Sequence, residues 1–120
     1  MTPTTKDNRP KQLWEIYVPT MRKSGKPIRT RHHQNWDNKV KRITKGLTIH
    51  KPVVGIWDSD QTGIEYRERM IPVKIMATRD EMDSILRMTF KHYPDEEAFF
   101  YYCISDDVHI AERRVYEIKY

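Results

Sequence analysis

The spacing of apolar side chains along the chain predicts four β-strands and two helices. Residues 13–18 are rich in aromatic and β-branched types and end at Pro19, which is typical of a strand. From about residue 30, apolar side chains recur at i, i+4, i+7 and i+11, which indicates a helix with one narrow apolar stripe. The stripe consists of Trp36, Val40, Ile43 and Leu47. We expect Thr30 to be the N-cap of this helix and Gly46 to be the left-handed residue that ends it.

The middle of the chain predicts a hairpin. Residues 47–57 form an extended run, in which Pro52 and Gly55 favour an edge strand with a bulge or bend. A polar turn follows, and a return strand is expected over residues 64–77. The apolar positions of this return strand change from even to odd numbers. A bulge near residues 69–71 is therefore expected to bring its two halves into phase.

The second helix has the clearest start in the sequence. Thr78 and Glu81 fit a capping box, apolar residues follow at helical spacing, and Pro94 ends the helix. Residues 98–104 are almost all aromatic or apolar and predict the last strand. Residues 113–120 alternate in polarity, which indicates a short extra strand or an extended tail.

This order of elements predicts an α+β fold, a ferredoxin-like βαββαβ sandwich in which two helices cover one face of a four-stranded antiparallel sheet. We expect a single domain over residues 12–120, preceded by a disordered arm over residues 1–11. The third strand is central in this topology, yet it contains Pro72, which lacks a ladder donor. A bulge beside Pro72 would accommodate it.

The second face of such a sheet is left open by the helices. Candidates for this face are Glu15 and Tyr17 on the first strand, Tyr66 and Glu68 on the third, and one parity of residues 99–102 on the last. An aromatic, partly apolar face needs a cover, and we expect a second copy of the protein or the C-terminal tail to provide it. The alternative is a small-ligand pocket lined by Tyr17, Tyr66 and Glu68, in which a buried Glu68 could act as a base.

The positive charge is concentrated in the first half of the chain. The formal net charge is +5, but residues 1–52 carry 13 Lys or Arg and 3 acids, whereas residues 53–120 carry 9 Lys or Arg and 14 acids. This asymmetry favours a basic loop and helix that bind an anionic partner, with nucleic acid as the leading candidate. A solvated surface without a partner is the alternative. The candidate anion-binding residues are Arg22, Lys23, Lys26, Arg29, Arg31, Lys39 and Arg42.

Several classes of chemistry find no support in the sequence. There is no phosphate loop, dinucleotide-binding turn or nucleophile elbow, so no catalytic residue is identified and no cofactor is expected. The one cysteine, Cys103, excludes an intramolecular disulfide and is expected to be a small buried hydrophobe. Asp107 and His109 form the most ligand-like pair, but a zinc site needs three or four ligands, so no metal is expected. No membrane span or signal peptide is found, and the cytoplasm is the expected location.

Short motifs give the chain a resemblance to a known family. The motifs run through the first strand, the exit of the first helix and the hairpin, and the closing aromatic strand continues them to Ser105 and Asp106. They are Glu15-Ile16-Tyr17-Val18-Pro19, Gly46-Leu47-Thr48, Gly55-Ile56-Trp57 and Tyr66-x-Glu68. Over roughly residues 13–110 the chain resembles a widespread family of small uncharacterised bacterial and mobile-element proteins. The resemblance implies a small ferredoxin-like domain and no established activity. The basic loop at residues 22–31 and the acidic residues 95–97 depart from the family pattern.

Two functions follow from these observations. The first is a small non-catalytic binding or regulatory protein, homodimeric through its sheets, whose basic loop and first helix bind an anionic partner. The second is a small-ligand-binding protein or enzyme with its pocket on the open sheet face.

Overall fold

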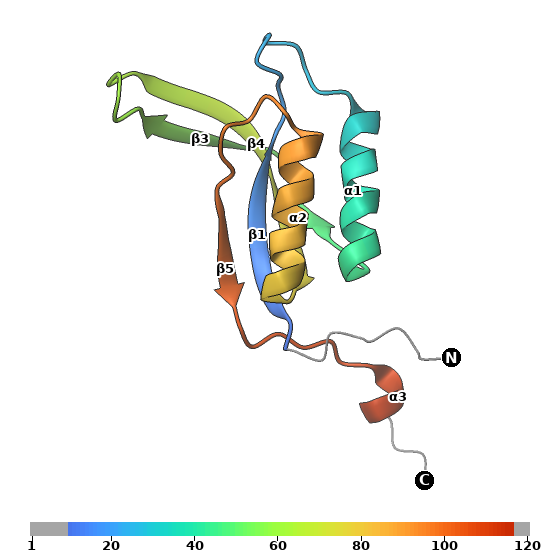
Figure 1. Ribbon diagram of the computed structural model, residues 1–120. Coiled ribbons are helices and arrows are strands. Elements are labelled where there is room, and N and C mark those ends of the chain that lie inside the picture. The colour runs from blue at the N-terminus through green and yellow to red at the C-terminus, as the bar shows by residue number, and fades with distance from the viewer. Residues whose placement is uncertain (1–9, 117–120) are drawn as a thin grey trace.

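Eight elements follow one another in the computed structural model, which describes residues 10–116 (Figure 1). They are β1 (Gln12–Pro19), α1 (Thr30–Thr44), β2 (Thr48–Ile49), β3 (Val53–Asp58), β4 (Glu65–Ala77), α2 (Arg79–His92), β5 (Tyr101–Ser105) and α3 (Arg113–Tyr116). The disordered arm predicted over residues 1–11 lies outside the described residues, except for Pro10 and Lys11.

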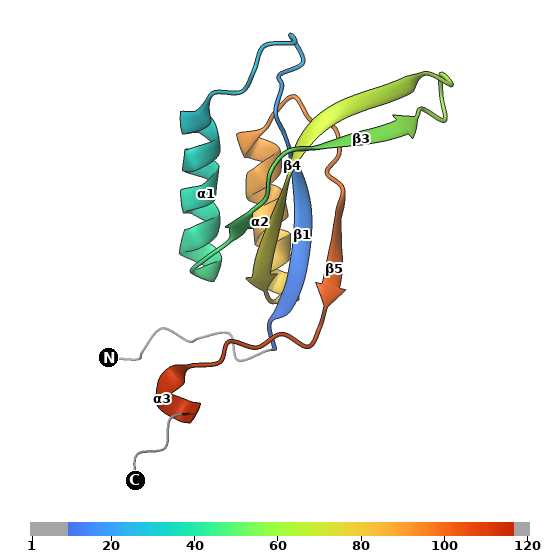
Figure 2. The same cartoon turned by 180° about the vertical axis from the view of Figure 1, so that it is seen from behind.

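The strands form one antiparallel sheet in the order β2-β4-β1-β5, and β3 extends the β2 side by pairing with the first half of β4. All eight residues of β1 pair with the second half of β4. Helices α1 and α2 lie side by side on one face of this sheet, and the other face carries no helix (Figures 1 and 2). This confirms the ferredoxin-like sandwich. A fifth strand arises because the run predicted as one strand over residues 47–57 is divided into β2 and β3.

The core lies between the helices and the sheet. The odd-numbered residues Val73, Ile75 and Ala77 of β4 face the helices and are buried, as are Trp14, Ile16 and Val18 of β1. Trp36 of α1 is fully buried, and its Nε1 donates a hydrogen bond to the hydroxyl of Thr89 on α2 at 3.0 Å. The predicted apolar stripe of α1 therefore packs where the periodicity placed it.

The helix ends agree with the sequence at α2 and differ at α1. The capping box of Thr78 and Glu81 is present in both directions. The N-cap of α1 is Arg29, not Thr30, and it makes no side-chain cap. The left-handed residue at the end of α1 is Lys45 (φ 73°), not Gly46. Its N–H closes the last turn on the carbonyl of Lys41, so the chain has already turned before the glycine is reached.

No bulge is needed in β4, contrary to the prediction. Pairing with β1 and β3 runs through the strand without a register shift. Pro72 lies opposite Tyr17, whose N–H donates to Phe100 on the other side of β1. In an antiparallel ladder, two residues that lie opposite each other without exchanging hydrogen bonds both point their backbone nitrogen and C=O groups away from the shared ladder. Pro72 therefore points these groups away from β1, as Tyr17 points its own away from β4. The nitrogen of Pro72 therefore faces the break between β2 and β3, where no strand needs a donor.

The hairpin of β3 and β4 projects from the body of the molecule (Figures 1 and 2). Its turn is closed by the N–H of Gly63, which donates to the carbonyl of Ser59 at 2.8 Å. Gly63 has a φ of 68°, a conformation that glycine adopts without steric cost. The hairpin and the segment that carries α3 both extend beyond the sheet and the two long helices, and the molecule is elongated, with extents of 65 × 33 × 26 Å (Figure 1).

The extra strand or extended tail predicted over residues 113–120 is wrong for its described part. Residues 113–116 form the short helix α3, held by a local bond from the N–H of Val115 to the carbonyl of Glu112. Residues 117–120 lie outside the described residues. An alternating pattern over so few residues does not select a strand when no neighbouring edge pairs with it. The preceding strand is also shorter than predicted, since β5 begins at Tyr101.

Candidate functional site

The open face of the sheet carries a buried acid surrounded by phenols and rings. Glu15 lies on β1, opposite Lys74 of β4 and Tyr102 of β5, and only 7% of it is exposed. The hydroxyl of Tyr17 donates to its Oε2 at 3.0 Å, and the hydroxyl of Tyr102 donates to the same oxygen. These bonds hold one carboxylate in a fixed orientation at the centre of the face. The hydrogen bond to Glu15 also raises the pKa of Tyr102.

Phe100, which directly precedes β5, adds a third ring to those of Tyr17 and Tyr102. The ring centroid of Tyr17 lies 5.5 Å from that of Phe100 and 6.5 Å from that of Tyr102. Phe100 is 65% exposed, which is unusual for a ring of this size. Exposed π-faces beside a fixed carboxylate are the two features that attract an organic cation.

A second acidic region lies at the base of the hairpin and on the segment that leads into β5. Burial raises the pKa of Glu96, and the negative charges of Glu68 and Asp95 raise it further. The charge of Glu68 therefore acts on Glu96 although the two residues are 28 positions apart in the chain. A cation bound between them would relieve this repulsion. Glu96 was not singled out by its sequence, because only the fold brings it near Glu68.

The three residues predicted to line one pocket share the open face but not one location. Tyr17 lies opposite Pro72, and Tyr66 precedes Pro72 by six positions on the same strand. At about 3.3 Å per residue, Tyr66 is roughly 20 Å away along β4, and Glu68 is roughly 13 Å away. Tyr66 pairs with Trp57 on the projecting hairpin, where both rings are about two-fifths exposed. One copy of the chain therefore brings Tyr17 together with Glu15 and Tyr102, and Tyr66 together with Trp57.

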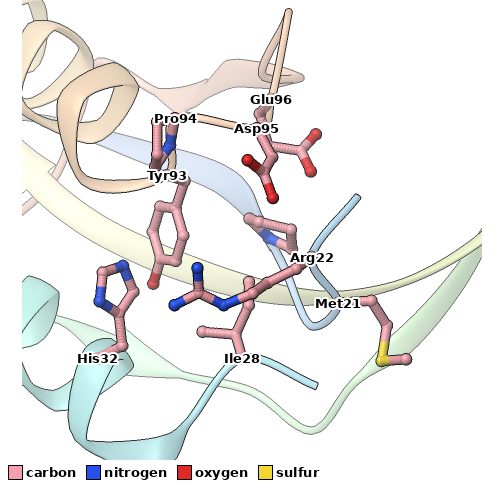
Figure 3. Close-up of a pocket in the computed structure, with 9 residues that line it drawn as sticks. Met21, Arg22, Ile28, His32, Tyr93, Pro94, Asp95 and Glu96 are labelled. Atoms are coloured by element: carbon pink, nitrogen blue, oxygen red, sulfur yellow. The ribbon is translucent and has the colours of Figure 1, made fainter. Parts of the chain in front are cut away.

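The basic residues predicted to form one face are divided between two places. Arg22, Lys23 and Lys26 lie on the loop after β1, where the N–H of Lys23 donates to the carboxylate of Asp95 at 3.0 Å. Arg22 lines a small pocket with His32, Tyr93 and the acids 95 and 96, and extends toward the Tyr93 ring (Figure 3). This pocket has a volume of about 20 Å³, which suits one water molecule.

The other predicted cations lie on α1. Arg29 and Arg31 are exposed at its start. Lys39 and Arg42 instead line a groove between α1 and α2. The loop cation Arg22 therefore lies beside Asp95 and Glu96, whereas the groove is a separate basic surface.

The candidate metal ligands and the cysteine of the described residues do not form a site. Within residues 10–116, no group of three His, Cys, Asp or Glu side chains could hold a metal ion. His109 lies 2.5 Å from Asp107, and both side chains are largely exposed. Cys103 is exposed rather than buried as predicted, because α1 and α2 lie over β4 and β1 and leave the outer strand β5 uncovered (Figure 1). No helix within 10–116 is long and apolar enough to cross a bilayer.

Comparison with known proteins identifies neighbours by structure only. No protein-family model matches the sequence, and no curated protein matches it significantly. Among solved structures, the fold is similar to the divalent cation tolerance protein CutA1 of Thermus thermophilus, with a TM-score of 0.61, 9% identity, and 88% and 90% of the two chains covered. It is similar to CutA1 of Oryza sativa, with a TM-score of 0.63, 6% identity and coverage of 88% and 86%.

A further neighbour differs from the CutA1 proteins in chemistry. It is a phage S-adenosylmethionine (SAM) lyase in complex with S-methyl-5′-thioadenosine, with a TM-score of 0.57 and 9% identity. The similarity covers 97% of this chain and 100% of the lyase. At these identities the comparisons establish the ferredoxin-like fold.

Proposed function

We propose that this chain binds SAM on the open face of its sheet and cleaves it to S-methyl-5′-thioadenosine, as a homo-oligomer. The observation that carries the proposal is the Glu15 cluster, a buried carboxylate fixed by two phenols beside exposed rings. SAM carries a positively charged sulfonium and an aromatic base. A carboxylate attracts the former, and exposed rings can stack on the latter.

The full-length similarity to a SAM lyase favours this ligand over a divalent cation. The lyase is matched from end to end, and it is described in complex with a nucleoside. The CutA1 neighbours are named for divalent cation tolerance. Residues 10–116 contain no group of three metal-ligating side chains, whereas they do contain an acidic and aromatic face.

The proposed reaction needs no cofactor. The carboxylate oxygen of the methionine moiety attacks its own Cγ, the S–Cγ bond breaks, and sulfur keeps the bonding electrons. The products are neutral S-methyl-5′-thioadenosine and a five-membered lactone that retains the ammonium charge, so atoms and charge balance without water. The protein has to fold the substrate into this geometry, and holding a reactive conformer is a large source of rate enhancement. No proton has to be removed, so Glu68 is proposed as a contact for the cation rather than as a base.

A homo-oligomer completes this site. The Glu15 cluster and the Tyr66 region are too far apart to contact one small ligand in one copy of the chain, but a second copy can place its hairpin over the first copy's open face. The apolar residues exposed on the hairpin supply the contact area. They are Val53, Val54, Ile56, Trp57, Ile64 and Tyr66. The dimer expected from the sequence is the smallest such assembly, and light scattering measures the number of copies.

The test is turnover of SAM by the purified protein, with chromatographic detection of S-methyl-5′-thioadenosine. We expect product with the unmodified chain and at least a tenfold loss of rate (about 1.4 kcal/mol) in Glu15→Gln and in Glu68→Gln. Glu65→Gln is the matched control, because Glu65 lies on the opposite parity of β4 and is exposed. No turnover and no binding of S-methyl-5′-thioadenosine by the folded protein would refute the proposal.

A second candidate function is binding of nucleic acid by the basic loop and α1, and the charge asymmetry of the chain favours it. The names of the three structural neighbours mention no nucleic acid. If this function is correct, the affinity for DNA or RNA will fall steeply as salt rises. Affinity that does not change with salt, or no affinity at all, would exclude it.

A further inference from the structure

A basic groove of about 770 Å³ runs between α1 and α2, on the side of the molecule away from the open sheet face. Two of its cations, Lys39 and Arg42, come from α1, and two, Arg87 and Lys91, come from α2. Two histidines and two asparagines also line it, and no acidic residue does. The sequence could not reveal this groove, because its two halves lie more than 40 residues apart.

The four cations of the groove have no acidic partners in the described structure. None of the ion pairs formed among residues 10–116 includes any of them. Their spacing, i and i+3 on α1 and i and i+4 on α2, places each pair on one helix face. Repulsion between these like charges destabilises the protein without a ligand, and a bound anion would relieve that repulsion.

Two stacked histidines fix one end of the groove. The rings of His32 and His92 are 4.0 Å apart, and each Nε2 lies 2.6 Å from the other residue's carbonyl oxygen. Each Nε2 therefore donates, which leaves Nδ1 of His92 to accept from the Lys39 ammonium at 3.3 Å. Because these bonds join the start of α1 to the end of α2, the helices are antiparallel and Lys39 is held at the rim.

We propose that this groove binds a compact oligophosphate, namely the phosphate chain of a nucleoside triphosphate or inorganic polyphosphate. From residue 32 to residue 42 the groove follows α1 for about 15 Å, which is long enough to hold a chain of three phosphates. Single-stranded nucleic acid is normally bound through rings on which its bases stack. Here the aromatic lining consists of the two histidines, which stack on each other. The lining therefore favours a phosphate chain over a nucleic-acid strand.

Calorimetric titration of the whole protein tests this proposal with four probes: tripolyphosphate, ATP, AMP and a ten-residue oligothymidylate. We expect tripolyphosphate and ATP to bind and AMP to bind at least about tenfold more weakly, since each additional charged contact adds affinity. ATP binding tighter than tripolyphosphate assigns the site to a nucleotide, and equal binding assigns it to the phosphate chain alone. AMP binding as tightly as ATP, or oligothymidylate binding more tightly than tripolyphosphate, would overturn the proposal.

Paired variants locate the binding. The double substitution Arg87→Gln and Lys91→Gln removes two groove charges. Lys41→Gln with Lys51→Gln removes the same charge from exposed positions outside the groove. We expect at least about a tenfold loss of tripolyphosphate affinity in the first and less than about twofold in the second, with unchanged circular dichroism in both. Equal losses would mean that net charge alone attracts the anion, and the groove would then not be a site.

Discussion

The two faces of the sheet differ in which kinds of side chain they bury and which they expose. On the face toward the helices, Ile16, Val73 and Ile75 are at most 1% exposed, and the polar groups there are hydrogen-bonded. On the open face the carboxylate of Glu15 is buried while the rings of Phe100 and Tyr102 beside it are exposed. A face selected only for stability would bury its rings and expose its acid. The open face is therefore the one that carries the features of a binding site.

The same contrast explains the irregular pattern of β4. Its core residues Val73, Ile75 and Ala77 are odd-numbered where the helices cover the sheet, whereas Tyr66 and Met70 on the hairpin are even-numbered. Both sets lie in one regular strand. The change of parity marks the point where the apolar face passes from the helix side to the open side, and it needs no bulge.

The largest effect is expected on the helix side, at Trp36. Substitution of Trp36 by Ala removes a fully buried ring and its bond to Thr89, and we expect a loss of about 3–5 kcal/mol in the free energy of unfolding. Unfolding in urea measures it. A loss below about 1 kcal/mol would place Trp36 outside the core.

A smaller stability effect but a large functional effect is expected at Glu15. Glu15→Gln removes the charge that accepts from two phenols, and we expect a loss of about 1–3 kcal/mol together with the loss of turnover described above. Urea unfolding and the SAM assay measure the two quantities on one preparation. A variant that keeps full turnover would remove Glu15 from the site.

The hairpin is expected to matter for assembly rather than for folding. Trp57 is 42% exposed, so Trp57→Ala should change the unfolding free energy of one copy by less than about 1 kcal/mol. It should nevertheless shift the mass found by light scattering toward a single chain. An unchanged assembly would show that the hairpin does not cover the open face of a second copy.

The folded state is expected to become less stable in acid, because two histidines are partly buried between α1 and α2. Burial lowers the pKa of His33 and of His92 below the ordinary 6.5, and positive neighbours lower both further. The hydrogen bond from His92 to the backbone of His32 offsets part of this effect on the pKa of His92. The unfolded chain then takes up protons first, so stability is full above about pH 6.5 and falls as the pH drops below it. Burial raises the pKa of Asp37 and Glu96, which favours the folded state at lower pH, below the histidine range.

The midpoint of thermal unfolding at pH 7.5 and pH 5.5 measures this effect. We expect a lower midpoint at pH 5.5 and a smaller difference in His92→Gln. A midpoint that rises on acidification would contradict the burial of neutral histidines.

The sequence predicts those features that depend on near neighbours. The capping box at Thr78, the stripe through Trp36 and the alternation in β1 are local patterns, and the topology follows from their order. The alternation of side chains along a strand also predicts that Glu15, Tyr17, Tyr66 and Glu68 lie on the open face of the sheet.

Features that depend on distant segments could not be predicted. Three features require the folded chain. They are the effect of the Glu68 charge on the pKa of Glu96, the hydrogen bond from Tyr102 to Glu15, and the groove formed by basic residues of two helices. Pro72 is accommodated by a break in the neighbouring strand, which the sequence of β4 alone cannot reveal.

Amide hydrogen exchange with and without S-methyl-5′-thioadenosine tests the central claim most directly, because it reports which face the nucleoside contacts. We expect added protection in β1, in β5 and at the base of the β3–β4 hairpin, and none in α1. Protection confined to α1 and α2, or no change at saturating nucleoside, would contradict it.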